Sequence, residues 1–217
     1  MSSYTGVTFG AYHSYDDWGL KLTGVEIGMP EAKTDYVDVP GMNGYLDLTE
    51  AQNGRVRYGM RSLVFTFNAR HCDYGEWLDL ISTISAAIEG QQIKIILDFD
   101  SGYYYTGRCH IDTEKTNQVL AQVTIEANCD PYKMYVDATG GSYTISSSTT
   151  VGITGYPYND TLTVVSSAEM TMTFDGTEYE IDSGTNLLYG VDLEEGTNYL
   201  YFTGTGTVIV TNYGGRI

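Results

Sequence analysis

The feature that most limits what this chain can fold into is the alternation of apolar and polar residues at every second position. It is clear in residues 62–67 and 121–127, and again in residues 170–174. Successive side chains of a strand point to opposite faces, so each stretch predicts a half-buried antiparallel strand. The 25 glycines and 20 tyrosines agree with this prediction, because they favour tight turns and strands over helices. The sequence therefore predicts a mainly β protein.

One stretch has the helical period instead. Asp73 is placed to cap the first turn, with Glu76 three residues further on, which is an acidic variant of the capping box. Apolar residues then follow at spacings of four, three and four: Trp77, Ile81, Ile84 and Ile88. Gly90 stands where a glycine commonly follows a helix. These signals predict one amphipathic helix over about residues 74–89, with its apolar face in the core.

The two parts of the chain differ in charge and in pattern. Residues 1–137 hold 19 acidic and 10 basic residues, whereas residues 138–217 hold nine acidic residues and one base. The helix signal is confined to the first part, and the second is rich in glycine, serine, threonine and tyrosine. Because Pro131 and the glycine pair at 140–141 bracket this change, we expect a domain boundary between them.

Residues 1–136 are accordingly expected to form an N-terminal domain, and residues 137–217 a small antiparallel β-sandwich of the galectin or carbohydrate-module kind. Two turns between strands are expected inside this second domain. One lies at Asp175-Gly176 and the other at residues 204–206, Gly-Thr-Gly.

The formal net charge of −17 argues against two classes of partner. Binding to nucleic-acid phosphates needs clustered cations, and so does adsorption to an anionic membrane. Cys72, Cys109 and Cys129 form an odd set without short spacing, so no disulfide framework is expected and a reducing compartment is more natural. The chain shows neither a signal-peptide pattern nor an apolar run of membrane-spanning length. We expect a protein made in a cytoplasm, without membrane insertion.

The stretch HSYDDWGL places Asp16 beside Asp17 and next to a tryptophan. On a strand these neighbours would point to opposite faces, so they could not converge on one ion or substrate. In a turn they would cap backbone N–H groups instead. A structural role is therefore the preferred interpretation, and no catalytic pair is assigned.

Metal and cofactor sites are not expected either. The stretch DFDSGYYYTGR (Asp98–Arg108) begins like a calcium loop, but it lacks the third oxygen ligand and the closing acid, so a hairpin turn explains it better. The pairs His71-Cys72 and Cys109-His110 lack zinc-site spacing, although a site that takes one residue from each pair stays open. The chain has no nucleophile elbow, dinucleotide loop or phosphate loop.

Tyrosines offer a binding alternative in the second part of the chain. On the face of a sandwich they could form an aromatic platform on which sugars stack. Only their exposure would separate this role from the ordinary use of tyrosine in strands. The candidates are Tyr156, Tyr158, Tyr189, Tyr199 and Tyr201.

Two turn signals lie close together in VDVPGMNGYLDL, residues 37–48. Pro40-Gly41 suits the middle of a type II turn, and Asn43-Gly44 suits a type I′ turn. Charged residues interrupt the apolar residues that flank both turns. A projecting hairpin arm therefore fits this segment better than a central strand.

Several segments, taken together, resemble the distal tail proteins of long-tailed (siphovirus-type) bacteriophages or prophages. In chain order they are HSYDDWGL, EIGMPEAKTDYVDVPGMNGYLDLTE, YGMRSLVFTF, EWLDLISTISAAIEGQQIKIILDFDSGYYYTGR and CDPYK, which cover most of residues 10–133. The combination of acid-Trp-Gly-Leu, Val-Pro-Gly-x-x-Gly and Tyr-Tyr-x-Gly-Arg is its most specific part. The final segment, LEEGTNYLYFTGTGTVIVTNYGGRI, is similar to the closing strands of the family's C-terminal sandwich.

The resemblance implies a structural role. Family members form a six-fold ring at the tail tip, between the tail tube and the receptor-facing baseplate or tail-associated protein. Their N-terminal domain is a β-sandwich with one helix and a projecting β-hairpin, and their C-terminal sandwich points outward. The chain lacks the large insertions of longer members, so a sugar-binding role of such insertions does not carry over.

A closed ring needs a heterologous interface, and a hairpin arm that reaches a neighbouring copy would supply one. We expect the arm to provide this interface through Val37, Val39, Pro40, Met42, Tyr45, Leu46 and Tyr58. DNA would pass through the pore without specific binding. The alternatives are a carbohydrate-binding or adhesin module and, third, an enzyme acting on cell-wall polysaccharide, for which no paired acids can be assembled.

Overall fold

The computed structural model describes residues 5–51, 54–70, 73–115 and 120–217. It is mainly β, as the alternation predicted, and its sheets are antiparallel. The chain separates into two compact units, Met1–Pro131 with Ile217 and Tyr132–Arg216, here called the N-terminal and C-terminal units. Each unit has its own buried apolar cluster. None of the helices among the described residues has the length and apolarity needed to cross a membrane.

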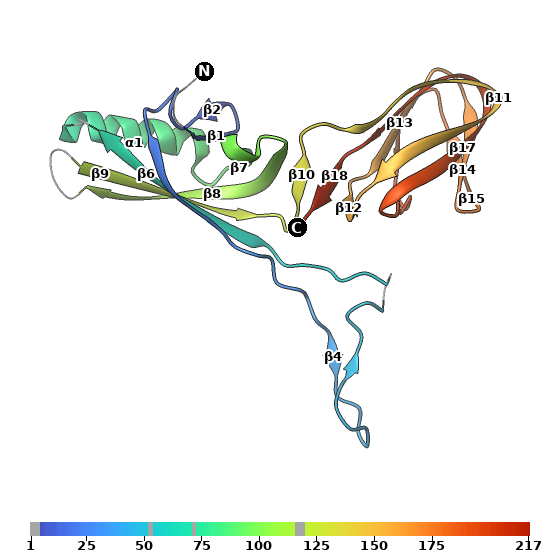
Figure 1. Cartoon of the computed structure of the whole chain (residues 1–217), viewed down its shortest axis with the longest axis horizontal. Coiled ribbons are helices and arrows are strands. Elements are labelled where there is room, and N and C mark those ends of the chain that lie inside the picture. The colour runs from blue at the N-terminus through green and yellow to red at the C-terminus, as the bar shows by residue number, and fades with distance from the viewer. Residues whose placement is uncertain (1–4, 52–53, 71–72, 116–119) are drawn as a thin grey trace. The chain divides into compact units, whose positions relative to one another are not determined.

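The N-terminal unit consists of one sheet, one α-helix and a hairpin (Figure 1). Its elements are β1 (Val7–Phe9), β2 (Tyr12–His13), β3 (Lys21–Ile27), β4 (Tyr36–Val37), β5 (Leu46–Asp47), β6 (Arg61–Arg70), α1 (Tyr74–Ile88), β7 (Gln92–Leu97), the 3-10 helix η1 (Asp98–Asp100), β8 (Tyr103–Lys115) and β9 (Leu120–Cys129). The sheet has the order β2-β1-β7-β8-β9-β6-β3, and β4 pairs with β5 alone.

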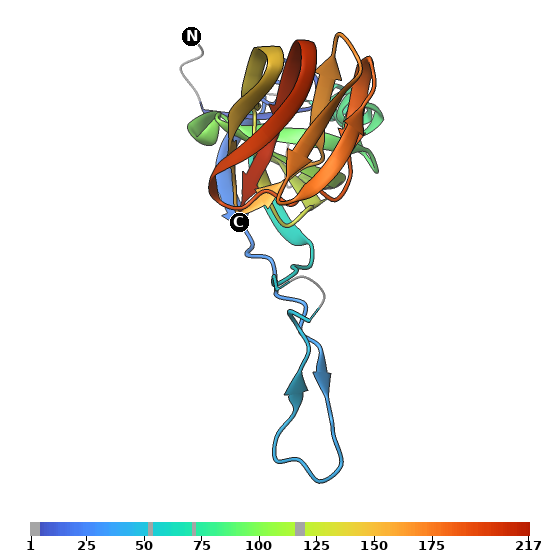
Figure 2. The same cartoon turned by 90° about the vertical axis from the view of Figure 1, so that its right-hand side faces the viewer.

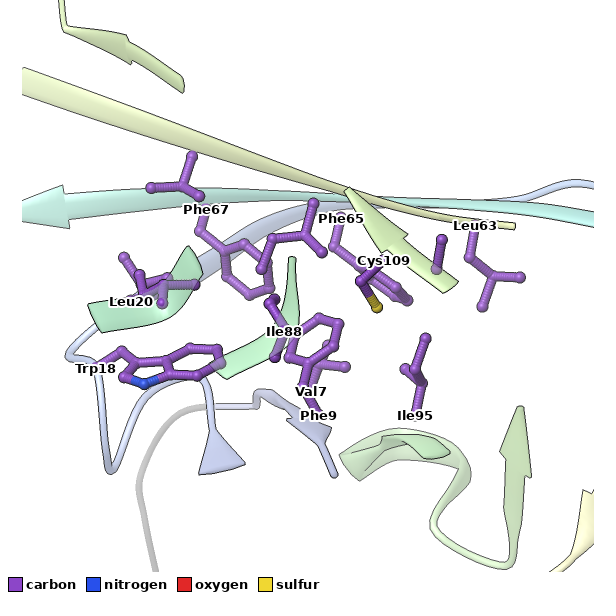
Figure 3. Close-up of a cluster of buried hydrophobic side chains, with 14 of the residues drawn as sticks. Val7, Phe9, Trp18, Leu20, Leu63, Phe65, Phe67, Ile88, Ile95 and Cys109 are labelled. Atoms are coloured by element: carbon purple, nitrogen blue, oxygen red, sulfur yellow. The ribbon is translucent and has the colours of Figure 1, made fainter. Parts of the chain in front are cut away.

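The sheet of this unit curls around its core. The ring of Phe9 on β1 lies 5.5 Å from that of Phe65 and 6.2 Å from that of Phe67, both on β6. Three strands separate β1 from β6 in the sheet order, so only a strongly curved sheet brings these rings together. Figure 3 shows these side chains with Trp18 and Ile88 between the layers. The two ends of one sheet thus form the sandwich that the resemblance implied.

Helix α1 covers the same core and has the predicted caps. The Asp73 carboxylate accepts a hydrogen bond from the Glu76 N–H at 2.9 Å, and the Glu76 carboxylate accepts one from the Asp73 N–H at 3.3 Å. Trp77, Ile84 and Ile88 are buried, whereas Ile81 is partly buried. The residue after the C-cap is Gly90, with φ +66°. The capping box and the helix-ending glycine are therefore confirmed.

The C-terminal unit contains strands only (Figure 2). They are β10 (Lys133–Tyr135), β11 (Thr139–Gly155), β12 (Tyr158–Asn159), β13 (Leu162–Ser166), β14 (Met170–Phe174), β15 (Thr177–Ile181), β16 (Gly184–Leu188), β17 (Gly196–Asn212) and β18 (Gly214–Arg216). One sheet has the order β15-β14-β17-β13-β16, with β11 paired along β17, and β18 pairs with β12 and β10.

The turn predicted at residues 204–206 is wrong. Strand β17 runs through them without reversing and pairs with β11 along all of its length. Its other edge pairs with β14 before these residues and with β13 after them. A Cβ atom on Gly204 would lie 2.6 Å from the Met170 Cβ, so the glycine allows a close approach at a bend. Phe202 and Val208 are both buried in one core, so the bent pair of strands covers that core from two sides.

The other predicted turn of this unit is confirmed. Asp175 and Gly176 join β14 to β15 with φ angles of +46° and +74°. Two successive positive φ values are what a two-residue type I′ hairpin requires.

Candidate functional site

Residues 28–51 and 54–60 belong to the hairpin arm of the N-terminal unit. At its root the Gly28 N–H donates to the Ser62 carbonyl at 2.8 Å, which connects it to the sheet. Further out, Ala32 forms a bridge with Tyr58, and β4 then pairs with β5. Backbone hydrogen bonds between the outgoing and the returning segment of the hairpin therefore hold the arm together (Figure 1).

Large apolar side chains of the arm are exposed on both of its faces. Adjacent residues of a strand point to opposite sides, yet Tyr36 (57%) and Val37 (39%) are both exposed, and so are Tyr45 (67%) and Leu46 (42%). A two-stranded hairpin without a buried face is only marginally stable in water. Exposed apolar side chains gathered in one segment are typical of a surface that contacts another protein.

The tip of the arm confirms one predicted turn and corrects the other. The Met42 N–H donates to the Val39 carbonyl at 3.0 Å and Gly41 has φ +87°, as a type II turn centred on Pro40-Gly41 requires. Asn43 does not have the positive φ that a type I′ turn needs, so that prediction is wrong. The last pair of the ladder is Val37 with Leu46, so a longer loop, and not a two-residue hairpin turn, joins β4 to β5.

The predicted interface residues all lie on the arm, but their exposure differs. Val37, Met42, Tyr45 and Leu46 are large and exposed, Pro40 is exposed, and Val39 and Tyr58 are partly buried. Sequence reasoning missed other exposed apolar residues of the arm and its root: Ile27, Met29, Tyr36, Leu48 and Met60. The sequence does not reveal that both faces of the hairpin are uncovered, because this depends on how β4 and β5 pair and on what packs against them.

Arg61 holds the root of the arm, and sequence reasoning did not find it. Its side chain is only 3% exposed. Its Nε donates to the Gly28 carbonyl at 2.9 Å, and its Nη1 donates to the Pro131 carbonyl at 3.2 Å. Its Nη2 lies 3.6 Å from the Met29 Sδ, and its guanidinium lies 5.4 Å from the centre of the Tyr105 ring. One side chain thus connects the start of the arm to the end of the N-terminal unit.

The acidic pair belongs to a turn, residues 14–18, rather than to a strand. The Asp17 carboxylate accepts a hydrogen bond from the His13 N–H at 2.6 Å. This is the capping of a backbone N–H group that we expected if the pair lay in a turn. The Asp16 carboxylate and Asp98 Oδ2 lie 3.2 Å from opposite nitrogens of the His13 ring. Asp98 also accepts from the Gly6 N–H at 2.7 Å. These contacts attach the N-terminal loop to the β7–β8 hairpin.

The described cysteines are buried and protonated. Burial raises the pKa of both Cys109 and Cys129 to about 12. Thiols with such pKa values are poor nucleophiles and poor metal ligands at neutral pH. In the described ranges no group of three or more His, Cys, Asp or Glu side chains is arranged to hold a metal ion. His71 and Cys72 lie outside the described residues, so the structure does not test the alternative of a zinc site shared between the two pairs.

His110 forms an exposed ion pair with Glu89. Its Nδ1 lies 2.8 Å from Glu89 Oε1, and Glu89 Oε2 accepts the Ile111 N–H at 2.8 Å. The hydrogen bond between the two side chains raises the pKa of His110 and lowers that of Glu89. The pair therefore stabilises the fold between these two pKa values. Its contribution is lost as the pH rises through the raised value or falls through the lowered one.

Two of the candidate sugar-platform residues are packed against other tyrosines. The ring of Tyr156 lies 4.6 Å from that of Tyr135, and the ring of Tyr158 stacks on that of Tyr132 at 4.4 Å. Arg216, the one base of the second part of the sequence, lies over the Tyr135 ring at 5.4 Å.

The three remaining candidates lie on other elements. Tyr189 follows β16 in a turn and is 74% exposed. Tyr199 and Tyr201 alternate along β17 with the buried Leu200 and Phe202, so they share the outer face of that strand. The five tyrosines therefore lie on several elements, and Tyr199 and Tyr201 share one sheet face.

The chain is similar in fold to a crystal structure of SPP1 Dit, described there as a paradigm of the hub adsorption apparatus in phages that infect Gram-positive bacteria. The match has a TM-score of 0.64 and covers 97% of this chain and 99% of that chain. At 15% sequence identity it establishes a shared fold along nearly the whole length of both. No family model and no curated protein sequence matches this chain.

Proposed function

We propose that this chain is a distal tail protein, a structural component of the virion of a siphovirus-type bacteriophage or prophage. Six copies form a ring at the tail tip. The ring joins the tail tube to the receptor-binding baseplate or tail-associated protein, and DNA passes through its pore. It assembles in the cytoplasm of the host bacterium and has no enzymatic role.

The arm is the observation that carries this proposal. It exposes apolar side chains on both faces, and it has no core of its own. An arm of one copy that lies on the next copy makes a heterologous contact, and such contacts close into a ring when the rotation between copies allows it. The full-length fold similarity to SPP1 Dit, a protein described as part of a phage hub, supports the same assembly.

The charge of the chain suits a channel for DNA. The excess of acidic over basic residues in 1–137 gives the ring domain a net negative charge. A pore lined with carboxylates repels phosphates, so the genome would pass without adhering. We expect a reconstruction of the assembled ring to show an acidic lumen, and a neutral or basic lumen would contradict this role.

Shortening the arm tests the assembly. Deletion of Val39–Leu46 removes the tip together with the exposed side chains of Met42, Tyr45 and Leu46, and should leave a folded protein that sediments as a monomer. The single change Tyr45→Ser should raise the concentration at which the assembly dissociates at least tenfold, because it removes a large exposed ring from the contact. Analytical ultracentrifugation with negative-stain imaging measures both effects.

Tyr189→Ser is the matched control, since it removes a tyrosine at least as exposed as Tyr45 that lies outside the arm. Its assembly should equal that of the unaltered chain. Rings that persist after the deletion would contradict the proposal that the arm forms the contact between copies. An unaltered chain that stays monomeric at high concentration would contradict the proposed hub function itself.

A further inference from the structure

Tyr199 and Tyr201 lie on the outer face of the sheet that contains β15, β14 and β17. In the β14–β17 register, Thr173 is the direct partner of Tyr201, and in the β14–β15 register it is the partner of Glu178. Direct partners in antiparallel strands point to the same side, so these three residues form one row across the face. Tyr199 lies two residues before Tyr201 on the same face of β17, so the two Cα atoms are about 7 Å apart.

A second row runs parallel to the first. Thr171 pairs with Thr203 on one side and with Glu180 on the other. The face therefore has two aromatic rings on β17, threonine hydroxyls on β14, and two carboxylates on the edge strand β15. Neighbouring strands are about 4.8 Å apart, so the backbone of β15, which carries the carboxylates, lies roughly 10 Å from that of β17, which carries the rings.

The rings are accessible although they lie within a sheet. Tyr199 is 55% exposed and Tyr201 is 51% exposed. The direct partner of Tyr199 on β11 is Gly152, and a Cβ atom there would lie 3.9 Å from the Tyr199 ring. Gly152 therefore adds no side chain that would cover the Tyr199 ring.

No side-chain hydrogen bond or ion pair joins Glu178, Glu180, Tyr199 or Tyr201 to another residue in the described part of the chain. Carboxylates accept hydrogen bonds from paired hydroxyl groups, threonines both donate and accept, and phenol rings present an apolar face with a polar tip.

We propose that this face binds a neutral oligosaccharide chain. Sugar rings would stack on Tyr199 and Tyr201, while hydroxyl groups bond to Thr173, Glu178 and Glu180. The second part of the sequence holds nine acidic residues and one base, so anionic polymers are repelled. A basic peptide would be drawn to the carboxylates, but they lie at the edge of the face and the two exposed rings lie at its centre. A ligand with apolar faces and hydroxyl edges satisfies both groups.

This site is independent of the proposed hub function, because it involves only the C-terminal unit. The full-length chain is titrated by calorimetry with hexasaccharides of N-acetylglucosamine, of glucose and of galactose, and with hexalysine as the basic competitor. We expect at least one hexasaccharide to bind. Its affinity should fall at least tenfold in Tyr201→Ala and severalfold in Glu178→Gln, and Tyr201→Phe should retain most of it because the ring remains.

Tyr189→Ala is the control for a general loss of exposed tyrosine, and its affinity should be unchanged. Far-ultraviolet circular dichroism verifies that each variant is folded. The proposal is overturned if none of the three hexasaccharides binds, or if Tyr201→Ala binds as well as the unaltered chain. It is also overturned if only hexalysine binds, with an affinity that disappears in salt.

Discussion

Gly140→Ala should destabilise the C-terminal unit by about 3 kcal/mol. Gly140 pairs with Thr211 in the β11–β17 ladder, and its φ is +123°. A Cβ atom there would lie only 2.0 Å from the carbonyl oxygen of Val210. That oxygen belongs to the backbone of a central strand, so it cannot move away without opening the ladder. Positive φ and steric overlap act together, each costing roughly 1–3 kcal/mol.

The matched control lies on the same strand. A Cβ on Gly152 would meet its nearest neighbour, Thr197, at 3.8 Å, which is an ordinary contact, and Gly152 does not have a positive φ. Gly152→Ala should therefore leave stability equal or slightly higher, because alanine restricts the unfolded chain. Urea unfolding followed by far-ultraviolet circular dichroism compares the two variants. Equal midpoints for both would contradict the geometry of the ladder at Gly140.

Arg61→Leu should lower the stability of the N-terminal unit by about 3 kcal/mol. Leucine retains apolar volume but removes the guanidinium that donates to the carbonyls of Gly28 and Pro131. A hydrogen bond from a charged donor contributes roughly 1.5–3 kcal/mol net of desolvation, and two are lost. Arg61→Lys should recover only part of this, because one ammonium cannot reproduce the planar fork of an arginine.

Tryptophan fluorescence isolates this effect. The chain has two tryptophans, and both Trp18 and Trp77 are buried in the N-terminal unit. Arg61→Leu should shift the fluorescence-detected urea midpoint, whereas Gly140→Ala should not. Arg108→Leu is the control, since Arg108 is an exposed arginine that donates to the carbonyl of Gly90. Its expected cost is below about 1 kcal/mol. A midpoint for Arg61→Leu that equals this control would show that the buried guanidinium contributes nothing.

Local signals predicted local structure well. Asp73, Glu76 and Gly90 act on backbone groups within a few residues, and the helix has the caps that they predict. Asp175-Gly176 is a two-residue turn for the same reason. The Gly-Thr-Gly at 204–206 misled because glycine permits a bend as readily as a reversal. Pairing with β11, whose partner residues lie about 60 positions earlier in the chain, decides between them.

The candidate sites depended on contacts that no local pattern encodes. His13 and Asp98 meet across 85 residues of sequence, and Arg61 reaches Pro131 across 70. Among the candidate tyrosines, strand register places Tyr201 in one row with Thr173 and Glu178, and Tyr199 lies on the same face of β17. A list of tyrosines could not make that separation.

Sequence patterns alone predicted the mainly β class, the position and caps of one helix, the change of pattern near residue 131, and the projecting arm. Period, capping and turn chemistry act over a few residues and can be identified along the chain. No sequence pattern predicted the curl of the sheet around Phe9, the bend of β17, or the exposure of both faces of the arm. These features follow from pairing and packing between distant segments, where many local patterns are compatible with more than one partner.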